Sequence, residues 1–215
     1  MAPGPAPRTR PGSRPWPWIG AVAVVLVALV VAVLAGGGGD DDGSPAATQG
    51  LDQTAPVTVT GTALPTLEDG TDTAVGRTAP VLAGTSFDGS PITIGPGRPA
   101  VVVFLAHWCP HCQREVPVLV EHFEETGLPT GVDVVAVATA TTADRPNYPP
   151  SSWLEGEEWP APVLVDSADG DAAEAFGLPG FPYAVGLDAS GKVVGRLSGE
   201  FSAAQFDALV ARARA

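Results

Sequence analysis

The chain has 215 residues and a formal net charge of −13 at pH 7. All 24 acidic residues lie from Asp40 onward, and only eight basic residues accompany them there. Such an acidic surface repels nucleic acid and anionic lipid, so it argues against a nucleic-acid-binding protein and favours a role of the charge in solubility. Two cysteines provide no disulfide framework, so the fold must depend on a hydrophobic core.

The N-terminal part divides into three segments. Residues 1–18 are rich in proline and arginine and are expected to form a cytoplasmic tail. Residues 19–39 begin with 17 consecutive apolar or small residues between arginines and aspartates, which predicts a transmembrane anchor with an external C-terminal domain. A cleaved signal peptide is the alternative, and the rest of the chain would then be secreted. Residues 40–75 are expected to form a flexible tether.

Residues 76–215 are expected to form one α/β domain, because strand and helix patterns alternate along them. The expected strands lie at residues 57–60, 86–87, 92–94, 100–105, 132–138, 163–166, 183–187 and 192–197. The expected helices lie at residues 110–126, 151–158, 171–176 and 202–213. The first helix joins two continuous apolar strands, which predicts a β-α-β unit with parallel strands buried on both faces. A long insertion, residues 139–162, follows the second of these strands.

Both cysteines lie where the strand at 100–105 turns into the helix at 110–126. Cys109 and Cys112 are close enough in sequence to place both sulfurs in the first helical turn, within disulfide reach. The free backbone N–H groups and the positive end of the helix dipole favour a thiolate there. We therefore expect Cys109, at the exposed end of the turn, to be a nucleophile, and Cys112, one turn deeper, to be the resolving thiol.

Two other interpretations of the cysteine pair are less favourable. A purely structural disulfide would close too short a loop to stabilise the fold much. A zinc site needs about four ligands, and only His107, His111 and His122 are present to supplement the two sulfurs. The pair therefore indicates redox chemistry, with no metal at the site.

The residues around the cysteines carry a resemblance to a known family. The sequence reads Trp-Cys-Pro-His-Cys at 108–112, Glu115 and Pro117 follow, and Gly-Phe-Pro lies at 180–182. With the order of strands and helices, this pattern resembles thioredoxin, and more specifically the membrane-anchored TlpA/ResA-type thiol-disulfide oxidoreductases. The resemblance covers about residues 76–213. It implies a thioredoxin-like fold, a central mixed sheet flanked by helices, with an N-terminal hairpin, a central insertion and an N-terminal transmembrane helix.

The resemblance also implies roles for individual residues. Pro182 is expected to follow a cis peptide bond and to face the cysteines, so that Phe181 and Pro182 contact the client protein. Trp108 is expected to shield the sulfur pair, with core packing as the alternative. Glu115 is expected to assist proton movement at Cys112, which suits a buried carboxylate with a raised pKa; an exposed helix residue is the alternative.

The implied activity is disulfide exchange with exported client proteins, apocytochromes c among the candidates, and with a redox partner in the membrane. The dithiol itself would be the redox group, so no cofactor is expected. The direction of electron flow stays open: the family implies reduction, whereas His111, in the Pro-His pair also found in DsbA, would stabilise the Cys109 thiolate and make the couple more oxidising.

Three other functions are alternatives to disulfide exchange. A copper-binding metallochaperone of thioredoxin fold is the main alternative, although the methionine ligands are missing. For a peroxiredoxin-like peroxidase, the expected sequence around the reactive cysteine is missing, and a non-catalytic interaction domain would not need both cysteines.

The insertion carries three aromatic residues. They would form either a client-binding surface beside the site or the packing of the insertion onto the domain: Tyr148, Trp153 and Trp159.

Overall fold

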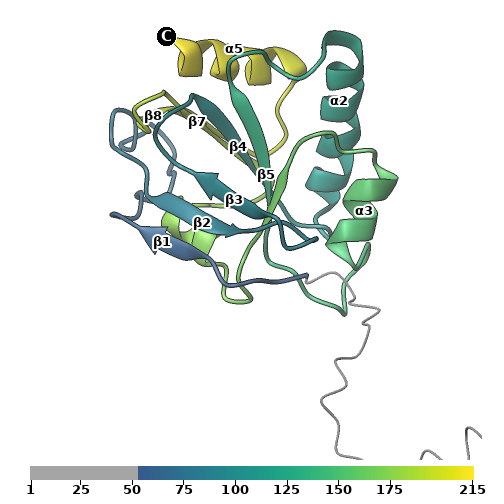
Figure 1. The fold of residues 1–215 in the computed structure, drawn as a ribbon. Helices are drawn as coiled ribbons and strands as arrows, with labels where there is room; N and C mark the ends of the chain where they lie inside the picture. Colours follow the sequence, from purple (N-terminus) through teal and green to yellow (C-terminus); the bar gives the residue numbers. More distant parts are fainter. Residues whose placement is uncertain (1–52) are drawn as a thin grey trace, which may run out of the picture. The chain divides into compact units, whose positions relative to one another are not determined.

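The computed structural model describes residues 53–215, which form two β-sheets with helices around the larger one (Figure 1). The strands are β1 (Thr58–Thr60), β2 (Val81–Thr85), β3 (Pro91–Ile94), β4 (Ala100–Leu105), β5 (Asp133–Ala138), β6 (Val163–Val165), β7 (Tyr183–Leu187) and β8 (Val193–Ser198). The helices are α2 (Pro110–Thr126), α3 (Pro150–Gly156), α4 (Asp171–Ala175) and α5 (Ala203–Arg214). The predicted cytoplasmic tail and membrane anchor lie outside the described residues.

The larger sheet is mixed, as expected, with the strand order β6-β5-β4-β7-β8. β4, β5 and β6 run parallel, and β7 and β8 pair antiparallel to their neighbours. β4 lies in the middle, and every one of its residues is buried, because its uninterrupted apolar sequence suits a strand covered on both faces. The cysteine turn therefore begins at the end of a fully buried central strand.

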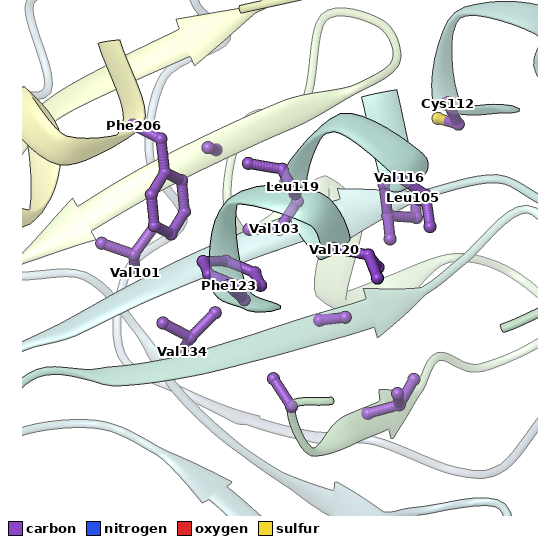
Figure 2. Close-up of a cluster of buried hydrophobic side chains, with 14 of the residues drawn as sticks. Val101, Val103, Leu105, Cys112, Val116, Leu119, Val120, Phe123, Val134 and Phe206 are labelled. Carbon is purple, nitrogen blue, oxygen red and sulfur yellow. The ribbon is translucent and has the colours of Figure 1, made fainter. Parts of the chain in front are cut away.

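Alternate residues of β4 enter two separate cores. Val101, Val103 and Leu105 point towards α2 and α5, where Figure 2 shows them beneath a row of side chains from α2 and beside Phe206 of α5. The intervening residues, among them Phe104, point to the opposite face and pack with α4 and the smaller sheet. This double burial fixes the strand and hence the position of the turn that follows it.

The smaller sheet is antiparallel, with the order β1-β2-β3. Its β2 lies at Val81–Thr85, so the expectation of a strand at residues 86–87 is wrong. Ser86 instead begins the turn, where its N–H donates to the carbonyl of Ser90 at 2.8 Å. Gly89 lies in that turn with a φ of +82°, which a residue with a side chain rarely adopts.

The described part of the expected tether is folded against the domain. Leu64 is 5% exposed, and its N–H donates to the carbonyl of Ala175 in α4 at 2.9 Å. Asp72 pairs with Arg196 of β8, whose side chain is fully buried and also donates to the carbonyl of Pro65 at 2.7 Å. The expectation of a flexible tether is therefore wrong for residues 53–75, because scattered apolar and charged residues there find distant partners that local periodicity does not reveal.

Among residues 53–215, no helix is both long enough and apolar enough to cross a bilayer. The apolar run at residues 19–39 lies outside the described part, so the expected anchor stays a prediction.

Candidate active site

The turn that holds the cysteines is built by the end of β4 and the start of α2. The N–H of Cys109 donates to the carbonyl of Ala106 at 3.0 Å, which closes the turn. Cys109 caps α2, and Pro110 takes the first helical position, where its missing N–H removes no helical hydrogen bond. Cys109 thus lies at the positive end of a 17-residue helix dipole, a place that favours a negatively charged sulfur.

The two cysteines differ in how far solvent reaches them. Both are free thiols; Cys109 is 6% exposed and Cys112 is 0% exposed. The expectation that Cys109 lies at an exposed end of the turn is therefore wrong in degree, although it is the more accessible of the two. Burial raises the pKa of Cys112 well above its usual range. A hydrogen bond with the backbone of Ala106 opposes this rise, and the neighbouring Cys109 and Glu115 add to it. Cys112 is therefore held as a neutral thiol beside a more accessible partner.

Aromatic and proline residues cover the Cys109 sulfur. Its Sγ lies 3.9 Å from the carbonyl oxygen of Phe181, and the Phe181–Pro182 peptide bond is cis, as the resemblance implies. The Trp108 ring meets the Phe181 ring edge to face, with 5.9 Å between centroids. The Trp108 Nε1–H donates to the carbonyl of Ala140 at 2.8 Å, so the ring is fixed to the insertion. The expected client-contacting residues thus surround the more accessible sulfur.

Glu115 lies on the buried side of α2, one helical turn after Cys112. It is 3% exposed, so the alternative of an exposed helix residue is wrong. Burial raises the pKa of Glu115 to about 7; the N–H of Phe201, which donates to Oε2 at 3.0 Å, opposes the rise, and the charge of Glu200 adds to it. Its Oε1 is buried without a hydrogen-bond partner among the described residues. The predicted buried carboxylate with a raised pKa is therefore present next to the resolving thiol.

His111 lies on the opposite, exposed side of the same turn and has an acidic partner that sequence analysis missed. Its Nδ1 lies 2.5 Å from Oε1 of Glu200, a residue in the loop between β8 and α5. Arg114, one turn further along α2, donates to the same Oε1 through Nε at 3.0 Å and through a second, shorter bond from Nη2. These hydrogen bonds, first from Arg114 and then from His111, lower the pKa of Glu200. The imidazole between the cysteines is thus paired with a carboxylate.

His107 is a second residue whose role sequence analysis missed. It is 1% exposed, and both ring nitrogens meet backbone groups of the insertion. Nδ1 lies 2.6 Å from the carbonyl of Pro146, which can only accept, and Nε2 lies 3.3 Å from the N–H of Thr142, which can only donate. These two contacts match a ring whose Nδ1–H donates to Pro146 and whose Nε2 accepts from Thr142. The available signal is a polar residue two positions after the end of an all-apolar strand, but the sequence alone suggests for it only the part of a supplementary zinc ligand.

The expected aromatic surface of the insertion is present only in part. Trp153 of α3 is 8% exposed and belongs to the core, and Trp159 packs edge to face on Phe123 of α2 at 5.9 Å. Tyr148 is 44% exposed, with its ring 6.0 Å from that of His107. The two tryptophans therefore fix the insertion to the domain, and the idea that they face a client is wrong.

A mixed sheet, a cysteine pair at the start of a long helix and a cis proline beside the more accessible sulfur define a thioredoxin-like protein. Residues 63–210 match the Redoxin family, and the chain belongs to that family. The match begins before residue 76, in agreement with the folded segment that was expected to be a tether.

Three known proteins illustrate the relationship. The methylamine utilization protein MauD of Methylophilus methylotrophus is 30% identical over 128 residues, which are 57% of this chain and 54% of MauD. The thiol-disulfide oxidoreductase ResA of Bacillus thuringiensis is 24% identical over 135 residues, 62% of this chain and 75% of ResA. The crystal structure of a thiol:disulfide interchange protein of the thioredoxin family from Chlorobium tepidum superposes with a TM-score of 0.52 and 29% identity, covering 63% of this chain and 94% of that one. The match thus spans about half the length of MauD, and the resemblance to ResA-type proteins is confirmed.

Proposed function

We propose that this protein is an extracytoplasmic thiol-disulfide oxidoreductase that exchanges disulfides with exported proteins through Cys109 and Cys112. The observation that carries the proposal is the asymmetry of the cysteine pair. Cys109 is the N-cap residue of a long helix and keeps some exposure, whereas Cys112 is fully buried on the same helix face as the carboxylate of Glu115. Disulfide exchange needs this division between an attacking and a resolving thiol.

The reaction proceeds in two exchanges. The Cys109 thiolate attacks one sulfur of a client disulfide; that S–S bond breaks, a mixed disulfide forms and the second client sulfur leaves as a thiolate. Cys112 then loses its proton and attacks the Cys109 sulfur, which releases the first client sulfur and forms the Cys109–Cys112 disulfide. The client has gained two electrons and the protein has lost them. The reverse sequence oxidises a client dithiol.

Glu115 is proposed to take the proton from Cys112. The thiol is neutral because its pKa is raised by burial, so the second exchange needs a base inside the domain. Glu115 follows Cys112 by three residues on the buried face of α2 and has a pKa of about 7, so it exists in both protonation states near neutral pH. Its unpartnered Oε1 is free to accept that proton.

The location and partners of the protein follow from its N-terminal sequence. We propose that residues 19–39 anchor the chain in the cell membrane, with residues 1–18 in the cytoplasm and the catalytic domain outside it. Three arginines before the apolar run and three aspartates after it support this orientation. The clients are then other exported proteins, apocytochromes c among the candidates, and a membrane protein exchanges electrons with the dithiol. The dithiol serves as the redox group without a bound cofactor.

Trapping the mixed disulfide tests the proposal directly. Cys112→Ala removes the resolving thiol, so we expect clients to stay covalently attached to Cys109 and to be released by dithiothreitol. Cys109→Ala with Cys112→Ala is the matched control and should trap nothing. In a purified assay, Cys109→Ser should abolish catalysed reduction of insulin disulfides. Full activity of Cys109→Ser, or equal trapping by the double variant, would overturn the assignment.

A further inference from the structure

The exposed side of the cysteine turn carries an imidazole, a guanidinium and one carboxylate. His111 and Arg114 of α2 are 58% and 56% exposed, and Glu200, which is 42% exposed, reaches both of them from the loop before α5. Glu200 lies 89 residues after His111 in the sequence, so the tertiary fold alone brings them together. All three side chains meet at the first turns of the helix capped by Cys109, the residue that the proposed function assigns to client attack.

We propose that Glu200 is a positioning residue that makes the Cys109–Cys112 couple less oxidising by pairing with His111 and Arg114. This inference rests on the proposed function and deepens it. The Pro-His sequence between the cysteines favours an oxidising couple when the imidazole supports the thiolate. Here Nδ1 of the imidazole lies 2.5 Å from Oε1 of Glu200 and 2.8 Å from Nη2 of Arg114, so a carboxylate stands among the groups that would support the thiolate and reduces the oxidising tendency of the sequence.

The electron balance gives the sign of the effect. Reduction of the disulfide takes two electrons and yields the Cys109 sulfur, in part as a thiolate, together with the Cys112 thiol, which takes a proton. Positive charge near Cys109 stabilises this reduced form, and stabilising the reduced form makes a disulfide a stronger oxidant. A carboxylate near those positive charges does the opposite.

The charges of Arg114 and Glu200 are close enough to interact. The hydrogen bond to Glu200 raises the pKa of Arg114, and the negative charges of Glu200 and of Cys109 raise it further. Arg114 therefore senses both the carboxylate and the reactive sulfur. Because Arg114 is always charged, Glu200 has a cation to offset even when His111 is neutral.

The same loop also reaches the buried side of the turn. Phe201 directly follows Glu200, and its N–H donates to Oε2 of Glu115. The charge of Glu200 adds to the raised pKa of Glu115. Two consecutive residues of the β8–α5 loop thus contact both sides of the cysteine pair. Glu200 contacts His111 and Arg114 on the exposed side, and Phe201 contacts Glu115 on the buried side.

This arrangement also bears on the direction of electron flow. A Pro-His pair without a counter-ion would favour oxidation of client dithiols. With Glu200 in place, the couple is shifted towards reduction of client disulfides, which is the direction that the family resemblance implies.

The test is the redox equilibrium of Glu200→Gln with glutathione, measured on the full chain at low salt. Exposed ion pairs are weak, so we expect the equilibrium constant for reduction of the protein by glutathione to rise about two- to fivefold. For a two-electron couple this is a shift of about 10–20 mV to a more oxidising potential. Asp207→Asn is the matched control, because Asp207 of α5 also pairs with a histidine of α2, His122, at 2.9 Å, and its loss changes the net charge equally. It should leave the equilibrium constant unchanged.

A second comparison separates the proposed pairing from a general charge effect. In a chain that carries His111→Ala and Arg114→Ala, adding Glu200→Gln should no longer raise the constant. The inference is overturned if Glu200→Gln changes nothing, if it lowers the constant, or if Asp207→Asn has the same effect. Failure of the wild-type protein to equilibrate with glutathione would instead contradict the proposed function.

Discussion

Two glutamates on opposite sides of the cysteine turn have opposite electrostatic environments. Glu115, 3% exposed, has its pKa raised to about 7 by burial. Glu200, on the exposed side, has its pKa lowered by its hydrogen bonds to Arg114 and His111. The buried side can therefore carry a proton near neutral pH, whereas the exposed side carries a fixed charge. Glutamate serves two purposes at this site because one side chain lies on the buried side of α2 and the other on its exposed side.

The largest expected contrast between the two sides is in stability. Leu119 lies on the face of α2 that packs on the larger sheet (Figure 2) and is 0% exposed, whereas its neighbour Val118 is 45% exposed. We expect Leu119→Ala to lower the free energy of unfolding by about 2–5 kcal/mol, because it leaves a cavity between α2 and β4. Val118→Ala should change it by less than about 0.5 kcal/mol. Urea unfolding measures both, and equal losses would contradict the division of α2 into a buried and an exposed face.

The second expectation concerns the pH dependence of stability through Glu115. Its folded-state pKa of about 7 lies above its ordinary value of 4.5. The contribution of protonated Glu115 to the free energy of unfolding is therefore fully present below about pH 4.5. It is lost as the pH rises through 7, because the buried carboxyl group must then ionise. Between pH 4.5 and pH 8 the wild-type protein should lose about 3 kcal/mol that Glu115→Gln does not lose.

The difference between the two unfolding curves is the measurement, because other titrating groups are common to both proteins. Glu121→Gln is a suitable control, since Glu121 is exposed on the same helix and its replacement should leave the pH dependence as in the wild type. Parallel curves for the wild type and Glu115→Gln would show that Glu115 titrates at its ordinary pKa, and the comparison of the two glutamates would fail.

The buried side of the site was more predictable from the sequence than the exposed side. β4 and α2 follow from local patterns, because an unbroken apolar run and a 3.6-residue spacing each determine burial without distant information. Glu115 was found because it lies three residues after Cys112 in a family motif. Glu200 was not found, because nothing in the sequence links it to His111, 89 residues earlier.

The errors in the fold have the same origin. The segment at residues 53–75 has few apolar residues, so it was expected to be a tether, but Leu64 enters a core built by α4. The short strands β2 and β3 pair with each other and with β1, and four or five residues carry too little pattern to set their bounds. For Trp153 the sequence left a client-binding surface and packing of the insertion both open, and its 8% exposure decides for packing.

A third expectation concerns the hydrogen bonds of His107, which are also on the buried side. His107→Phe keeps a ring of similar size but removes both bonds to the insertion, to Pro146 and to Thr142. We expect a local loss of about 1–2 kcal/mol, seen as roughly tenfold faster hydrogen exchange of the Thr142 amide. His122→Phe is the control, because the His122 ring pairs with the Asp207 side chain and should leave the exchange of Thr142 unchanged. Unchanged protection of Thr142 in His107→Phe would show that the ring does not hold the insertion.

The smallest expected effect distinguishes the two sides by salt. Exposed charges are screened within about 8 Å at physiological ionic strength and within about 3 Å at 1 M, whereas buried groups are screened much less. The two- to fivefold difference in redox equilibrium between wild type and Glu200→Gln should therefore shrink towards one as the salt concentration rises to about 1 M. The pH-dependent stability difference between wild type and Glu115→Gln should persist at the same salt concentration. If both differences disappear together, Glu115 is solvated like Glu200. If both persist, the contact of Glu200 with His111 and Arg114 is shielded from solvent. Either result would show that the contrast between a buried and an exposed side of the cysteine turn is wrong.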